Sequence, residues 1–102
     1  ISTVEEEPEL VQRSDGSYLA DGLLHIDDLK RTLGIKTDLP GEEKNSYHTV
    51  AGLVLYLLGE FPVRGSHVVS NGYRFEVVDL DGRRIDQILI EPHDTTDGET
   101  SS

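Results

Sequence analysis

The sequence predicts an α+β fold in which two helices pack on one face of a mostly antiparallel sheet of about five strands, in the order β-β-α-α-β-β-β. Three observations predict it. Apolar residues recur at helical spacing over residues 50–61. Apolar and polar residues alternate in the last third of the chain, between the turn pairs Asn71-Gly72 and Asp81-Gly82. A further pair, Asp15-Gly16, separates two short runs near the start and predicts a hairpin with a two-residue turn.

The main helix is predicted over residues 49–61. Thr49 suits the N-cap, because its hydroxyl can accept a hydrogen bond from a free N–H of the first turn. Gly59 suits the left-handed residue that ends a helix, and Pro62 prevents its continuation. The apolar residues at i, i+3, i+4, i+7, i+8 and i+11 predict one buried stripe, formed by Val50, Leu53, Val54, Leu57, Leu58 and Phe61.

A shorter helix is predicted over residues 26–33, with Ile26, Leu29 and Leu33 on one face and Gly34 at its end. The Asp-Gly pair at 21–22 predicts the turn that leads out of the first hairpin. Residues 35–48 are polar and are predicted to form a loop. Glycines 16, 22 and 82 are interpreted as turn residues, and Gly52 as a point of close approach between the main helix and a strand.

Three strands are predicted after the main helix, over residues 66–70, 73–80 and 83–91. Short gaps between them require antiparallel neighbours. Three consecutive apolar residues indicate that the last strand is central and covered on both faces: Ile88, Leu89 and Ile90.

A single domain is predicted over residues 10–92, between an acidic linker at 1–9 and a disordered polar tail at 93–102. The chain has 102 residues and begins with Ile, so we interpret it as a piece of a longer protein. It contains no Cys, which excludes a disulfide framework, a thiolate zinc site and a cysteine nucleophile.

The net charge of −11 argues against nucleic-acid partners and against acidic lipid surfaces. No apolar run approaches the roughly 20 residues that span a bilayer, so we expect no direct membrane insertion by this segment.

The main helix is apolar on more than one side, because residues 53–58 contain no polar residue. One sheet face cannot cover such a helix alone. Either the loop at 35–48 folds over the rest or another protein surface does, and we predict Leu55 and Tyr56 as the partner surface in the second case.

The ordered motifs of the chain resemble the transporter-associated domain of the CorC/HlyC type. The resemblance covers about residues 10–91 and rests on five segments in the order of that family: DGSYLADG at 15–22, IDDL at 26–29, TVAGL at 49–53, LGEFP at 58–62 and YRFEVVDLDGRRI at 73–85. Together these segments are specific, whereas any one of them alone would be weak.

The resemblance implies a C-terminal module on the cytoplasmic face of the inner membrane in a bacterial membrane protein. In such proteins the module follows a membrane domain and a pair of CBS domains, in a family of magnesium and cobalt efflux or hemolysin-like proteins. It implies a non-catalytic role in modulating ion transport, through contacts with the CBS domains or with a second copy. The family is also grouped with flavin-binding domains by fold, which is an analogy of shape.

No enzyme is predicted, because the sequence lacks a nucleophile elbow and a phosphate-binding glycine loop. We therefore expect no catalytic residues and no cofactor. Two alternatives stay open: a sensor domain that binds adenine or flavin nucleotides, and a weak sensor of divalent cations. For the latter the candidate ligands are Asp79 and Asp81, although the positions that an EF-hand reserves for Gly and Glu hold Arg84 and Ile90. The four histidines show no metal-binding spacing.

Overall fold

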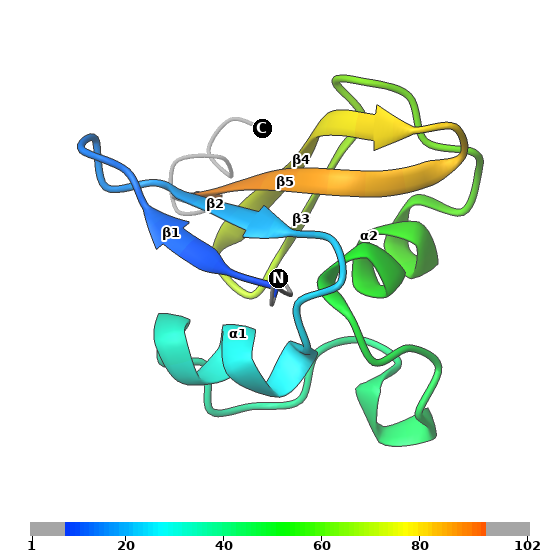
Figure 1. Cartoon of the computed structure of the whole chain (residues 1–102). Coiled ribbons are helices and arrows are strands. Elements are labelled where there is room, and N and C mark those ends of the chain that lie inside the picture. The colour runs from blue at the N-terminus through cyan, green and yellow to red at the C-terminus, as the bar shows by residue number, and fades with distance from the viewer. Residues whose placement is uncertain (1–7, 94–102) are drawn as a thin grey trace, which may run out of the picture.

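A computed structural model describes residues 8–93 and shows two helices against one antiparallel sheet (Figure 1). The five strands lie in the order β1-β2-β5-β4-β3, which confirms the predicted α+β class and chain order. The elements are β1 (Leu10–Gln12), β2 (Tyr18–Asp21), α1 (Ile26–Leu33), the 3₁₀ turn η1 (Glu42–Lys44), α2 (Val50–Leu58), β3 (His67–Ser70), β4 (Tyr73–Asp81) and β5 (Arg84–Pro92).

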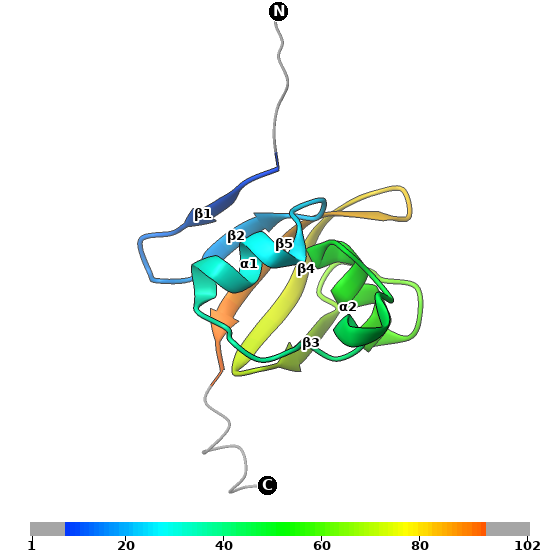
Figure 2. The same cartoon turned by 90° about the horizontal axis from the view of Figure 1, so that it is seen from below.

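Both helices cover the same face of the sheet, as Figure 2 shows from below. The core lies between the two layers, and apolar side chains of both layers meet there because strands place every second residue on one face. Its largest fully buried members are Leu29, Leu39, Val50, Leu53, Val54, Phe75, Val77, Ile85, Ile88 and Ile90.

β5 is the central strand, as its run of apolar residues predicted. Ile88 and Ile90 face the helices and are fully buried. Leu89 points to the opposite face and is only half-buried, so the prediction that both faces are covered is wrong. The reason is that both helices lie on one side of the sheet.

The caps of α2 are confirmed at both ends. The Thr49 hydroxyl accepts a hydrogen bond from Gly52 N at 3.1 Å, and Gly59 adopts φ +75° just after the last helical residue. The helix therefore ends at Leu58, three residues before the predicted end at Phe61. Phe61 lies beyond the left-handed turn with 72% of its surface exposed, so its assignment to the buried stripe is wrong.

Two of the three predicted hairpin turns differ from their prediction. Asn71 and Gly72 both have positive φ and form the expected two-residue turn. Asp81, however, pairs with Arg84, so the next turn is formed by residues 82–83. In the first hairpin Gln12 pairs with Tyr18, which leaves a five-residue loop at 13–17 in place of a two-residue turn.

Gly22 lies in the predicted turn, which the hydrogen bond from Leu24 N to Asp21 O closes at 3.0 Å, and it is also a point of close contact. A Cβ on Gly22 would lie 2.1 Å from the carbonyl oxygen of Ile85 in β5, so only glycine fits between the strand and the start of α2. Gly52 also needs its lack of a side chain, but a Cβ there would meet Tyr47 of the loop at 2.7 Å. The predicted contact of Gly52 with a strand is therefore wrong.

The described part of each predicted terminal segment is tied to the sheet. Asp21 N donates to Glu9 O at 3.0 Å, and His93 N donates to Gly72 O at 2.8 Å. The rest of the predicted linker and tail, residues 1–7 and 94–102, lies outside the described residues.

Candidate interaction surface

The segment between the helices covers part of α2. Tyr47 is 8% exposed, and its ring lies 5.5 Å from that of Tyr56 on α2. Its hydroxyl donates to Pro40 O, and burial raises its pKa to about 12, with the carboxylates of Glu42 and Glu43 adding to the effect. Leu39 enters the core from the same segment. The loop predicted at 35–48 therefore folds onto the helix.

Glu42 holds this covering segment in place from within η1. Its Oε1 accepts a hydrogen bond from Leu39 N at 2.8 Å, and both carboxylate oxygens lie 3.0 Å from Lys30 Nζ on α1. The hydrogen bond from Leu39 N–H is the main cause that lowers the pKa of this carboxyl below its usual value, and Lys30 adds to it. Burial has the opposite effect and is outweighed. One side chain thus joins the loop to the first helix.

The cover is incomplete, and several apolar side chains stay in contact with solvent. Leu55 is 40% exposed and Tyr56 is 46% exposed, the two residues predicted as a partner surface. Phe61 and Val63, in the segment that follows α2, are exposed to a greater extent. The Arg83 guanidinium lies 5.0 Å from the centre of the Phe61 ring, which places the β4–β5 turn beside this segment. Whether Leu55 and Tyr56 contact a partner stays a prediction.

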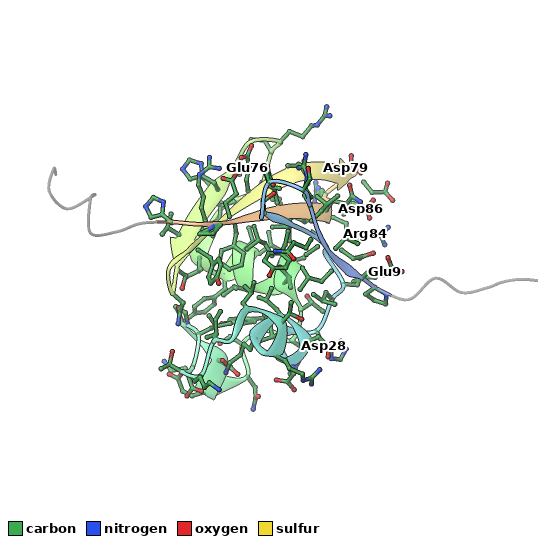
Figure 3. The ribbon with its side chains drawn as sticks, turned by 90° about the vertical axis from the view of Figure 1, so that its left-hand side faces the viewer. Glu9, Asp28, Glu76, Asp79, Arg84 and Asp86 are labelled. Carbon is green, nitrogen blue, oxygen red and sulfur yellow. The ribbon has the colours of Figure 1, made fainter. Side chains whose placement is uncertain are left out.

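The candidate cation ligands lie where β4 ends. Asp81 accepts a hydrogen bond from Arg84 at 3.0 Å, and Asp79 pairs across the sheet with Gln87. Figure 3 shows Asp79 at the same edge of the molecule as Asp86 and Arg84. Within residues 8–93 no three His, Asp or Glu side chains are arranged to hold a metal ion. Cation binding by Asp79 and Asp81 stays a prediction.

A shallow polar pocket of about 210 Å³ opens between the start of α1 and η1. It is lined by His25, Ile26, Asp27, Glu42, Asn45, Tyr47 and His48. Two of these residues, His25 and His48, lie 23 positions apart in the chain, so their spacing in the sequence did not relate them. The two histidines meet because His25 pairs with Thr49 in an isolated bridge. The pocket is smaller than the roughly 300–1,000 Å³ of most ligand sites.

The start of α2 offers no cradle for a nucleotide phosphate. A free helix N-terminus binds phosphate through unpaired backbone N–H groups. Here Val50 N donates to Leu24 O at 2.9 Å, Ala51 N donates to Gly22 O at 3.0 Å, and Gly52 N is taken by the cap. The first turn of α2 is therefore satisfied from within the fold.

Comparison with known proteins gives the family. The family described as transporter associated domain, CorC_HlyC, matches residues 11–94. The chain belongs to this family. Among relatives, the UPF0053 protein sll0260 of Synechocystis is 48% identical over 99 residues, which are 95% of this chain and 22% of that protein. The polyamine export protein of Salmonella typhimurium is 40% identical over 84 residues, 82% of this chain and 18% of that protein. The chain thus spans about a fifth of the length of these relatives.

Solved structures of single domains share this fold. A transporter-associated domain from a Xylella fastidiosa hemolysin, solved in complex with Mg²⁺ and Mn²⁺, is 40% identical with a TM-score of 0.72, and the match covers 83% of this chain and 98% of that one. The corresponding domain of a CBS domain protein from Porphyromonas gingivalis is 33% identical with a TM-score of 0.73, over 83% and 98% of the two chains. In residues 8–93 of this protein neither helix is long and apolar enough to cross a membrane.

Proposed function

We propose that this domain is a non-catalytic module that modulates cation transport by the larger protein to which it belongs. The observation that carries the proposal is the family match over residues 11–94 in a domain whose main helix leaves apolar side chains exposed. Exposed apolar residues around a helix are typical of a protein contact. A function through protein contact also agrees with two features of the fold. The pocket is shallow, and the backbone N–H groups at the start of α2 are hydrogen-bonded within the domain.

The partners we propose are a CBS domain pair and a membrane domain of the same protein, at the cytoplasmic face of the membrane, with a second copy of the domain as the other candidate. Two observations support this arrangement. The relatives are about five times as long as the matched segment. The similar Porphyromonas gingivalis domain belongs to a CBS domain protein.

The cargo we propose is a cation, and two classes are candidates. Magnesium and cobalt are the ions that the family resemblance implies. Polyamines are the second class, because relatives that are 40% identical are polyamine export proteins. Both classes carry positive charge, so the charge of the cargo does not distinguish them. Transport assays with each cargo in turn do.

The test is transport by the full-length protein with residues 10–91 deleted. We expect an altered efflux rate, or an altered dependence of efflux on cargo concentration, for magnesium, cobalt or spermidine. A membrane-inserted deletion protein with unchanged efflux of all three would contradict the proposal.

A point variant gives a milder test of the same idea. Leu55→Asp places a charge on the exposed side of α2, and we expect it to alter transport in the same direction as the deletion. Val69→Asp is the matched control, because Val69 is 42% exposed and its neighbour Val68 packs on the core, so Val69 points to the face of the sheet opposite α2. Equal effects of the two variants would indicate a general loss of stability.

A nucleotide sensor has no support from the geometry at the start of α2, where the N–H groups of Val50, Ala51 and Gly52 are already hydrogen-bonded. Divalent-cation sensing is kept as a second candidate function. It is supported by the similar Xylella fastidiosa domain, which was solved with Mg²⁺ and Mn²⁺.

A further inference from the structure

One end of the molecule carries an apolar surface of which the sequence predicted only Leu55 as a contact residue. We call it the end surface and define it by Leu23, Leu55, Phe61 and Val63, with Arg83 beside Phe61. Three of its four apolar residues, Leu23, Phe61 and Val63, are more than half exposed. A surface of this kind needs a functional explanation more than single exposed apolar residues do.

Contacts between the elements place these residues at the same end of the sheet. Gly22 lies against both Ile85 and Ala51, since a Cβ on it would be 3.3 Å from the Ala51 Cβ. Leu55 follows Ala51 by one helical turn and therefore lies on the same face of α2. Figure 2 shows α2 beside the turn that joins β4 to β5, and Arg83 of that turn touches Phe61.

The chemistry of the end surface is that of a protein contact. Aromatic and arginine side chains are enriched among the residues that dominate binding energy. Arg64 follows Val63 in the sequence and Arg83 lies over the Phe61 ring, and neither arginine forms a salt bridge within residues 8–93. In a chain with a net charge of −11, these unpaired arginines favour a partner whose rim is acidic.

The chain enters the domain at this same end. Asp21 N donates to Glu9 O, and the Asp21 carboxylate accepts a hydrogen bond from Leu23 N at 3.0 Å, so the first described residues lie close to Leu23. β1 is antiparallel to β2, and Glu9 before it therefore lies toward the end where β4 turns into β5. Figure 3 shows Glu9 at the same edge as Arg84 and Asp86.

A domain that precedes this one in the chain is joined to it at Glu9, close to Leu23 of the end surface. A covalent connection of this kind raises the effective concentration of the two surfaces, so even a weak contact forms within the chain. A second copy lacks this advantage, and two chains of net charge −11 repel each other.

We propose that the end surface docks on the domain that precedes residue 8 in the full-length protein, against an apolar patch rimmed by carboxylates. The proposal rests on the proposed function and names the contact through which it operates. Phe61 is the central anchor, and Arg83 pairs with the acidic rim of the preceding domain.

The test is photo-crosslinking in the full-length protein with p-benzoylphenylalanine at position 61. We expect a product with the mass of one chain, in which mass spectrometry maps the link to the preceding domain. The same crosslinker at position 69, on the edge strand β3, is the control and should give at least about fivefold less of this product, the ratio that about 1 kcal/mol of contact energy produces.

Charge reversal tests the chemistry of the contact. Arg83→Glu should lower the yield of the position-61 link by about fivefold, whereas Arg31→Glu on α1 should leave it unchanged. A product with the mass of two chains would show a second copy on the surface and overturn the proposal. So would a yield at position 61 no greater than that at position 69.

The two proposals can fail separately. If the deletion of residues 10–91 alters transport but position 61 gives no intramolecular link, the domain functions through another surface and only the docking proposal is wrong. If the link forms but the deletion leaves transport unchanged, the domain docks without modulating transport and the proposed function is wrong.

Discussion

Gly22 is the residue at which the helix layer and the sheet come into closest contact. Its N–H donates to Asp86 O in β5 at 2.9 Å, and its carbonyl accepts from Ala51 N at the start of α2 at 3.0 Å. The helix and the central strand therefore both hydrogen-bond to one residue of the β2–α1 connection. This arrangement requires the backbones to approach closely, which any side chain on Gly22 would prevent.

Gly22→Ala should destabilise the domain by about 3 kcal/mol or more. The added Cβ meets the Ile85 carbonyl oxygen, a backbone atom of the central strand that cannot move without breaking the sheet. Gly16→Ala is the control, because Gly16 has φ +92° but open space around it, and we expect a cost of about 1 kcal/mol. Urea unfolding followed by circular dichroism measures both. Equal costs would mean that the close approach at Gly22 does not limit stability.

Sequence patterns predicted the residues whose role is local and missed those whose role depends on distant contacts. Thr49 and Gly59 were correctly placed because a cap involves neighbours within one turn. Gly22 was correctly placed in a turn, but nothing within the Asp-Gly pair reveals that Ile85 lies against it. The pocket histidines His25 and His48 were missed for the same reason.

At the scale of elements, the helical pattern overran the true end of α2. The stripe continued in phase to Phe61, but the left-handed residue at Gly59 turned the chain away from the core. Six apolar positions in a row correctly indicated that the sheet alone does not cover this helix. The sequence could not decide between the loop and a partner, because the cover depends on contacts of Glu42 and Tyr47 that have no local pattern.

The segment that covers α2 should give the domain a distinct acid sensitivity through Glu42. Its pKa is lowered in the folded state, so its ionised form stabilises the fold above the unfolded value of 4.5, and this stabilisation is lost as the pH falls through the folded pKa. Glu42→Gln should therefore cost roughly 1 kcal/mol at pH 7 and show a flatter loss of stability between pH 5 and pH 3.

The measurement is the urea midpoint as a function of pH. Glu43→Gln is the matched control, because Glu43 is the exposed neighbour in η1 and forms no salt bridge within the described part of the chain. The prediction is wrong if the two variants follow the same pH profile, since the Glu42 contacts with Leu39 and Lys30 would then add no acid-sensitive stability.

At the scale of the whole molecule, charge decides how the domain responds to cations. A net charge of −11 on 102 residues is self-repelling, so any salt that screens it should raise the melting temperature to some extent. A specific divalent site adds a stabilisation that depends on free cation concentration and not on ionic strength alone. The comparison between Mg²⁺ and Na⁺ at equal ionic strength therefore separates general screening from binding.

We expect 10 mM MgCl₂ or MnCl₂ to raise the melting temperature more than NaCl of equal ionic strength. A weak site with a Kd of about 1 mM would contribute roughly 1.4 kcal/mol at that concentration. The additional rise in melting temperature should disappear in the double variant Asp79→Asn/Asp81→Asn, because both candidate carboxylate ligands are removed. One of them, Asp81, pairs with Arg84 in the cation-free domain. Asp38→Asn removes a charge from an exposed loop residue and should leave the excess intact. An excess that is absent from the unmodified chain, or that survives the double substitution, would rule out Asp79 and Asp81 as the cation ligands.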